Sequence, residues 1–176
     1  GGRQITDNGK LLVRYETAEH EPCVLNTMHL KNPITADSFK IHAPAGAKKV
    51  KALVMDTLAH MPFTNRRDVE LPVVDGVVQC DVEQDVLYIA QVERHGKNGN
   101  VGKAFMGGFH IRGGAMASSV GHDNHNIIVM GDSFEDMALA VNRCVELGGG
   151  QVIVRSGKVA AEVAYPICGR LSALPL

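Results

Sequence analysis

The sequence predicts an α+β fold with a mainly antiparallel β-sheet and one long helix near the C-terminus, at about residues 133–147. Three observations lead to this prediction. Many short β-forming runs are separated by turn residues, only one segment has a clear helical period, and strands do not alternate with helices as in a parallel sheet. With 176 residues, the chain is long enough for one domain with a hydrophobic core.

The N-terminal part predicts a hairpin followed by a connector. In the opening run RQITDNGKLLVR, Asp7-Asn8-Gly9 supplies residues that tolerate positive φ between two β-forming runs. Residues 16–33 are polar and contain two prolines, so we expect an extended connector. Residues 35–39 fit a single helical turn with Thr35 as its N-cap.

The middle of the chain reads as a series of strands. The predicted strands are 48–59, 71–75, 77–80, 86–93, 115–120 and 126–131. Asp75-Gly76, a dipeptide typical of tight turns, joins the second to the third. The stretch HGKNGNVGKAFMGGFHIRGG (95–114) lacks the GK[ST] ending of a phosphate-binding loop, so we expect its glycines to serve turns and close backbone approach.

The one strong helical signal lies on the C-terminal side. Ser133 is a good N-cap, and Asp136 three residues later completes a pair that resembles a capping box. Apolar residues then recur at helical spacing, and Gly148-Gly149-Gly150 ends the helix. The run QVIVRSGKVAAEV (151–163) predicts a second hairpin with its turn at Ser156-Gly157.

Composition and charge narrow the classes of function. The net charge is −1, aromatic residues make up 5% and Trp is absent, so no nucleic-acid partner is expected. The longest apolar runs are too short to cross a bilayer, so no membrane partner is expected. The four cysteines are widely and irregularly spaced, which fits reduced thiols in a cytoplasmic protein better than a disulfide framework or a structural zinc site.

A polar cluster separates two apolar runs in SSVGHDNHNIIVMG (118–131). Its members are His122, Asp123, Asn124, His125 and Asn126. One interpretation is a tight loop, in which Asp and Asn side chains bond to the backbone two residues on. The other is the lining of a pocket, since histidine serves as acid, base or metal ligand and an adjacent carboxylate can fix its tautomer. Two histidines at i,i+3 in a loop are a weak metal signal, so we assign no metal ligand.

A second polar group, Glu93-Arg94-His95, stands at the end of the strand 86–93. One interpretation is a charged sheet edge, which proteins use to prevent pairing with other chains. The other is that these side chains contribute to a binding site.

Several runs carry a family resemblance. VERHG (92–96), GNVGKAFMGGF (99–109) and GAMASSVGHDNHNIIVMG (114–131) resemble the C-terminal domain of bacterial adenine deaminases, in the amidohydrolase superfamily. The similarity continues through 136–169, and 24–41 is similar too. The resemblance implies a hydrolase that converts adenine to hypoxanthine and ammonia in purine salvage.

The resemblance also implies parts that this chain lacks. Such enzymes carry their metal ligands on a (β/α)₈ barrel that precedes this domain, and a barrel needs roughly 200 residues or more. We therefore expect no TIM barrel, no cofactor in this chain and no activity of the chain alone. Divalent metals, manganese or iron, are implied for the full-length enzyme. The chain is interpreted as an excised or separately encoded C-terminal domain.

By the same resemblance, residues 1–20 are the trailing hairpin of a β-domain that follows the barrel, and 21–176 are the C-terminal α+β domain. The cluster is then expected to face the barrel. The candidates for supporting the metal site or relaying a proton are His122, Asp123 and His125. The candidates for contacting the purine are Asn124, Asn126, Glu93, Arg94 and His95. Expected partners are the barrel, adenine and further copies of the protein. The alternative is a free-standing, non-catalytic binding module for a purine or a protein partner.

Overall fold

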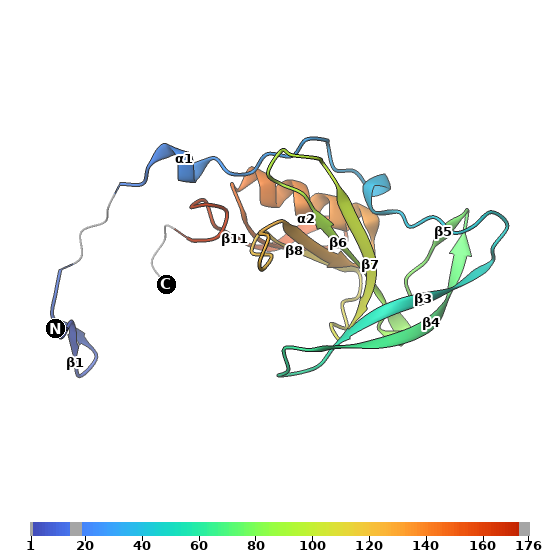
Figure 1. The fold of residues 1–176 in the computed structure, drawn as a ribbon, viewed down its shortest axis with the longest axis horizontal. Coiled ribbons are helices and arrows are strands. Elements are labelled where there is room, and N and C mark those ends of the chain that lie inside the picture. The colour runs from blue at the N-terminus through green and yellow to red at the C-terminus, as the bar shows by residue number, and fades with distance from the viewer. Residues whose placement is uncertain (1, 15–18, 173–176) are drawn as a thin grey trace.

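A nine-stranded sheet is the main element of the computed structural model, which describes residues 2–14 and 19–172 (Figure 1). Its strands are β3 (Lys49–Thr57), β4 (Thr64–Val74), β5 (Val77–Val78), β6 (Leu87–Val92), β7 (Val101–Gly107), β8 (Gly114–Ser118), β9 (Ile127–Gly131), β10 (Gly150–Arg155) and β11 (Lys158–Ala164). They lie in the order β11-β10-β8-β9-β6-β7-β3-β4-β5. All neighbours are antiparallel except β3 and β7. The sheet is open and not a barrel, which confirms the predicted α+β class.

Three tight turns lie where the sequence predicts them. Asp75-Gly76 joins β4 to β5, Ser156-Gly157 joins β10 to β11, and Asn8-Gly9 joins β1 (Thr6–Asp7) to β2 (Lys10–Leu11). Both residues of each pair have positive φ, between 47° and 77°. A two-residue hairpin turn of this hand follows the twist of its strands, which is why Asn, Asp and Gly favour it.

The long helix α2 (Phe134–Glu146) packs on β8, β9 and β10, so the predicted helix is confirmed. Ser133 is its N-cap, with Oγ accepting the N–H of Asp136 at 3.2 Å. The expected reciprocal capping by Asp136 is wrong. Its Oδ1 instead accepts the N–H of Gly157 at 2.8 Å, which ties the β10–β11 turn to the start of the helix.

Three further features differ from the sequence predictions. Residues 16–18 of the predicted connector lie outside the described residues, and its described part contains a short helix, α1 (Pro22–Leu25), because proline is favoured in a first helical turn. β4 begins seven residues earlier than expected, at Thr64, because its charged residues pair across strands, as Arg67 does with Asp56 at 2.7 Å. The glycine-rich stretch contains a strand, β7, since its glycines fit between β6 and β3.

Two 3₁₀ turns complete the fold. The predicted turn after Thr35 is η1 (Ala36–Phe39), and the N–H of Thr35 donates to Ser38 Oγ at 3.1 Å. The second turn, η2 (Val82–Gln84), is capped by Asp81, whose side chain accepts two backbone N–H groups. Within the described ranges no helix is both long and apolar enough to span a membrane.

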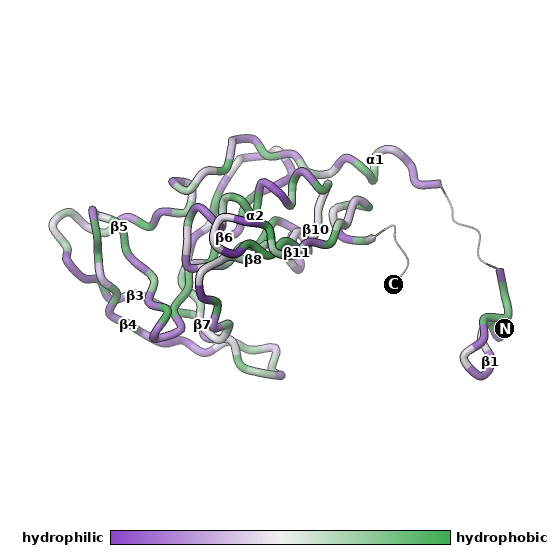
Figure 2. Tube along the Cα trace, turned by 180° about the vertical axis from the view of Figure 1, so that it is seen from behind, coloured by the Kyte–Doolittle hydropathy of each residue, from purple (hydrophilic) through white to green (hydrophobic). Residues whose placement is uncertain are grey.

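The hydrophobic core lies between α2 and the sheet. Residues on the side of the sheet that carries α2 are buried: Val54, Val129 and Val152 are each 0% exposed. Figure 2 shows hydrophobic stretches in α2 and in the strands around β8. In Figure 1 α2 lies along one side of the sheet. We call the opposite side of the sheet the open face, and six of its apolar members by strand register are Met55, Ile89, Met106, Met116, Ile128 and Ile153.

Candidate functional site

The polar cluster lies in the loop that connects β8 to β9. Two hydrogen bonds shape this loop. The N–H of His125 donates to the carbonyl of Gly121 at 2.5 Å, and the N–H of Asn126 donates to Oδ1 of Asn124 at 3.0 Å. His125 has a φ of 54°. The tight-loop interpretation therefore describes the backbone correctly, since Asn124 bonds to the main chain two residues on.

The buried side chain of Arg94 binds the backbone of the loop from inside the protein. The residue is only 2% exposed. Nε donates to the carbonyl of His125 at 2.5 Å, Nη1 to that of Thr27 at 2.8 Å, and Nη2 to that of Cys168 at 3.0 Å. Burial lowers the pKa of the guanidinium, which nevertheless keeps its charge at neutral pH. One buried cation therefore joins the loop, the connector and the C-terminal segment.

Glu93 organises the turn that follows β6. It is 8% exposed, and its carboxylate accepts the backbone N–H groups of His95, Lys97, Asn98 and Gly99 at 2.6–3.2 Å. Burial acts to raise the pKa of Glu93, but these four donors outweigh it, so the pKa is lowered. Glu93 thus faces its own turn and not the loop.

His95 and Gln91 join this turn and the strand to the loop. His95 Nε2 lies 3.0 Å from the carbonyl of Asn124, which assigns the proton to that nitrogen. Gln91 Nε2 donates to Asn124 Oδ1 at 3.2 Å. Sequence reasoning missed Gln91, although an amide within the otherwise apolar run VLYIAQV was a signal that could have found it.

Ser119 is a second residue that sequence reasoning missed. It is fully buried at the start of the loop. Its hydroxyl donates to the carbonyl of Gly169 at 2.5 Å and accepts the N–H of Gly150 at 2.8 Å. No sequence signal distinguishes it from Ser118 beside it. Ser119 fixes the end of β8 to the start of β10 and to the C-terminal segment.

Two members of the cluster point away from the protein. His122 Nδ1 contacts Asp123 Oδ1, and both side chains are 86% exposed. The ring of His125 lies edge-on to that of His122, with centroids 6.3 Å apart. This arrangement suits a histidine whose tautomer is set by a carboxylate, beside a second histidine.

The two residues nearest β9 carry atoms without partners. In the described part of the chain, the buried side-chain atoms that lack a hydrogen bond are His125 Nδ1 and Asn126 Oδ1. Burial lowers the pKa of His125, and the nearby charge of Arg170 lowers it further. The imidazole is therefore neutral at pH 7, and it can donate at one nitrogen and accept at the other.

The cluster does not form a metal site by itself. Among residues 2–14 and 19–172, no three His, Cys, Asp or Glu side chains are grouped so that they could hold an ion. His122 and Asp123 offer two ligands, and structural or catalytic zinc sites use three or more protein ligands.

Comparison with known proteins gives the family. The profile described as "Adenine deaminase C-terminal domain" matches residues 62–176. Over 175 residues the chain is 42% identical to an adenine deaminase of Moorella thermoacetica and 43% identical to one of Clostridium botulinum, strain ATCC 19397. Over 176 residues it is 41% identical to an adenine deaminase of Ruegeria pomeroyi. The matches cover 99% of this chain and 29% of each relative. The chain therefore belongs to the adenine deaminase C-terminal domain family.

Proposed function

We propose that this chain acts as the C-terminal domain of an adenine deaminase, which hydrolyses adenine to hypoxanthine and ammonia in purine salvage. Support comes from the family and from relatives that are named adenine deaminases and are more than three times as long. We place the catalytic barrel in the part of such a protein that lies outside the aligned region. A free-standing binding module is not favoured, because the named relatives are deaminases.

The observation that carries the site proposal is the pair of unpartnered atoms on His125 and Asn126. Buried polar atoms are paired in the great majority of cases, and leaving one unpaired costs about 1–3 kcal/mol. Two such atoms on adjacent residues of one loop indicate that stability alone did not shape it. A purine edge, or a group of the barrel, offers the missing donors and acceptors.

Each candidate residue receives a role that fits its contacts. His125 is neutral and half-buried, so it accepts a proton on one nitrogen and delivers one from the other to the departing amine. Asp123 orients His122 beside it. Asn126 and Asn124 provide amides for the purine. His95, Arg94 and Glu93 act through the loop backbone and the neighbouring turn, which their hydrogen bonds position.

In this proposal the metal ions are bound by the barrel and not by this chain. Manganese or iron bound there would supply activated water for attack on the amino-bearing carbon. The residues of this chain bind the purine edge, limit access of bulk water and move a proton at His125. We further propose that residues 1–20 are the trailing hairpin of a separate β-domain, and that the assembled protein is a homo-oligomer. Four free cysteines fit a reducing cytoplasm.

The test is a turnover measurement on the full-length product of the gene that encodes this chain. With manganese or iron present, we expect adenine to be converted to hypoxanthine with one ammonia released per adenine. The matched control is the same protein stripped of metal and returned to activity by adding metal back. Absence of turnover in a folded, metal-loaded protein would contradict the proposed function.

A further inference from the structure

We propose that the open face of the sheet is the docking surface for the catalytic part of the same polypeptide. This inference rests on the proposed function above, and it adds the surface by which the two parts join. The surface comprises the six open-face residues defined above, which extend from β10 to β3, together with Leu53 beside them on β3.

On two strands, β10 and β3, exposure differs sharply between the two faces. On β10, Val152 is 0% exposed on the helix side, whereas Ile153 on the open face is 46% exposed. On β3, Val54 is 0% exposed and its neighbour Leu53 is 49% exposed. Large apolar side chains thus line the open face: those at the margins are exposed, most of those on the central strands are half-buried, and Leu87 and Met130 are buried among them. Contiguous patches of this kind mark contacts with other proteins or domains.

Two strands near the centre of the sheet, β8 and β9, have the composition of a sheet covered on both sides. A strand with one face in water alternates apolar and polar residues, while a strand buried on both faces is continuously apolar. β9 reads Ile-Ile-Val-Met over 127–130, and Met116 lies between two alanines on β8. Only one set of these alternating residues is covered by α2. The other set, on the open face, is therefore expected to be covered by a second layer of protein.

The open face has the size of an interface between domains. From β11 to β3 the sheet has six strand spacings of about 4.8 Å, which gives a width of roughly 29 Å. Five residues along each strand, at about 3.3 Å each, give a height of roughly 16 Å. Interfaces between domains of one chain bury about 600–1,500 Å² in total, so a surface of these dimensions is sufficient.

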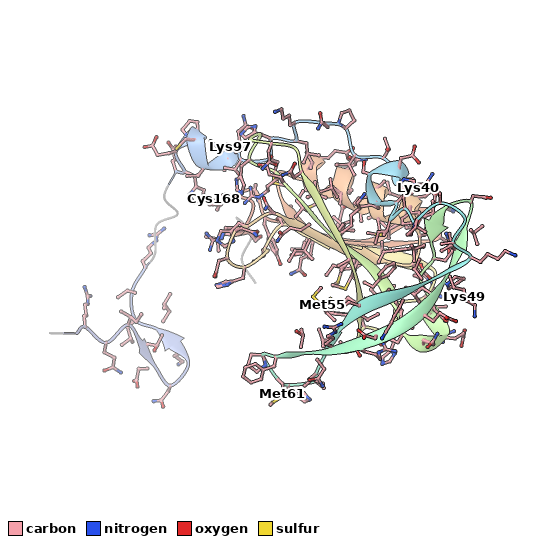
Figure 3. All side chains as sticks on the ribbon, turned by 45° about the vertical axis from the view of Figure 1, so that its right-hand side comes forward. Lys40, Lys49, Met55, Met61, Lys97 and Cys168 are labelled. Carbon is pink, nitrogen blue, oxygen red and sulfur yellow. The ribbon has the colours of Figure 1, made fainter. Side chains whose placement is uncertain are left out.

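Charged side chains border the apolar surface. Along β3 and β4, Lys51 pairs with Asp68 at 3.1 Å and Lys49 pairs with Glu70 at 2.7 Å, on the same side of the sheet by register. An apolar centre with a polar rim is the usual anatomy of a specific interface. Figure 3 shows Met55 on the inner side of β3 and Met61 at the projecting tip of the β3–β4 hairpin, where Met61 is 55% exposed.

The surface adjoins the polar loop. A groove of about 300 Å³ on the open face is lined by Met55, Ile89, Gln91 and Ile128, among others. Gln91 is the residue that donates to Asn124 of the loop. A domain seated on the open face would therefore lie beside Asn124 of the loop. Docking here would place the catalytic part next to the candidate site.

The catalytic part of the polypeptide is the occupant best supported. The relatives carry this domain as 29% of one longer chain, and covalent linkage gives the remaining part a high effective concentration at any surface it fits. A second copy of the domain would cover the apolar area equally well. It would, however, bring no catalytic group to the loop.

The experiment uses the full-length protein with the substitution Ile153→Asp on the open face. The control is Val159→Asp on the neighbouring strand β11, where Val159 is 37% exposed and pairs with Val154 on the helix side. A carboxylate buried in a docked interface disfavours docking, so the undocked population should rise about tenfold or more. The rate at which a protease releases the domain is proportional to this undocked population. We expect release about tenfold faster for Ile153→Asp and unchanged for Val159→Asp.

A second measurement needs no substitution. Peroxide oxidation of the full-length protein is followed by mass spectrometry at Met106, Met116 and Met28, which are all half-buried in the domain alone. Met28 packs away from the open face, beside Arg94. Docking predicts several-fold slower oxidation at Met106 and Met116 than at Met28. Equal oxidation rates, together with equal release of the two aspartate variants, would overturn the proposal.

Two further outcomes separate the alternatives. If light scattering shows that Ile153→Asp splits a dimer while release stays unchanged, the occupant is a second copy and the docking proposal is wrong. Adenine turnover is measured on the unmodified protein in parallel. A protein that shows the release and oxidation pattern but no turnover supports docking and contradicts only the proposed function.

Discussion

Arg94 Nε donates to the carbonyl oxygen of His125 at 2.5 Å, across 31 residues of chain. The contact sets the backbone of the loop from inside the protein, while the side chains of His122 and Asp123 remain outside. The rigid part of the candidate site and its exposed part are therefore separate. Substitutions beneath the loop should change stability, and substitutions on its surface should change activity.

Arg94→Ala should destabilise the protein by about 3 kcal/mol or more, because several buried carbonyls lose their donor. Arg94→Lys should recover only part of this loss, since an ammonium cannot reach three separated carbonyls in one geometry. Urea unfolding measures the effect. The control is Arg155→Ala at the exposed end of β10, expected within about 0.5 kcal/mol of the parent protein. Equal losses for both alanine variants would contradict the role of Arg94.

Glu93→Gln should lower the free energy of unfolding at neutral pH. It should also make that free energy less dependent on pH in the acid range. The folded-state pKa of Glu93 is lowered, so its carboxylate adds stability above the unfolded-state value of about 4.3, and this is lost as pH falls through the folded value. Unfolding free energy measured between pH 7 and pH 3 should therefore fall less steeply in the variant. Glu19→Gln, at an exposed site, serves as the control. The same acid slope in all three proteins would be inconsistent with the four amide contacts.

His125→Ala should lower adenine turnover of the full-length protein about 10²–10⁴-fold, if His125 relays a proton, with metals still bound. The pKa of His125 is lowered below its ordinary 6.5, so the acid limb of the turnover profile should lie below that pH and should disappear in the variant. A merely structural loop behaves differently. Early melting with near-normal turnover at low temperature would show that the cluster is only a turn.

Asp123→Ala offers a separate test of the exposed pair. We expect reduced turnover with an unchanged thermal midpoint, because both side chains of the His122–Asp123 contact are exposed and contribute little to stability. Asp123→Asn is the matched variant, which keeps the shape and removes the charge. Full activity in both variants would exclude a role for Asp123 in orienting His122.

Gly149→Ala should destabilise the fold more than Gly157→Ala does. Both glycines have positive φ, at 112° and 76°. A side chain at Gly157 meets open space, so the cost is about 1 kcal/mol of backbone strain. A side chain at Gly149 also collides with the backbone of Gly169, which holds the C-terminal segment against the helix end. Thermal midpoints of the two variants compare these costs directly, and equal shifts would argue against this contact.

Local signals predicted the regular elements well. Asp75-Gly76 and Ser156-Gly157 mark their turns because positive φ is a property of single residues. Ser133 marks the start of the helix for a similar local reason. Local signals did not predict the strand β7, because Gly102 and Gly107 suggest turns unless the neighbouring strands are known. The strand β4 is longer than predicted because Arg67 pairs with Asp56 on the neighbouring strand, and a pattern of nearby residues cannot reveal such a contact.

The sequence by itself determined the α+β class, the order of hairpins and helix, and the presence of a polar cluster between two apolar strands. These depend on backbone preferences and spacing along a few residues. Only the tertiary structure decided what the polar residues do. Arg94 binds carbonyls 31, 67 and 74 residues away in the chain, and Glu93 binds four backbone amides of its own turn. Apart from proline, every residue offers the same backbone N–H and carbonyl, so their partners are determined by the path of the folded chain and not by residue type.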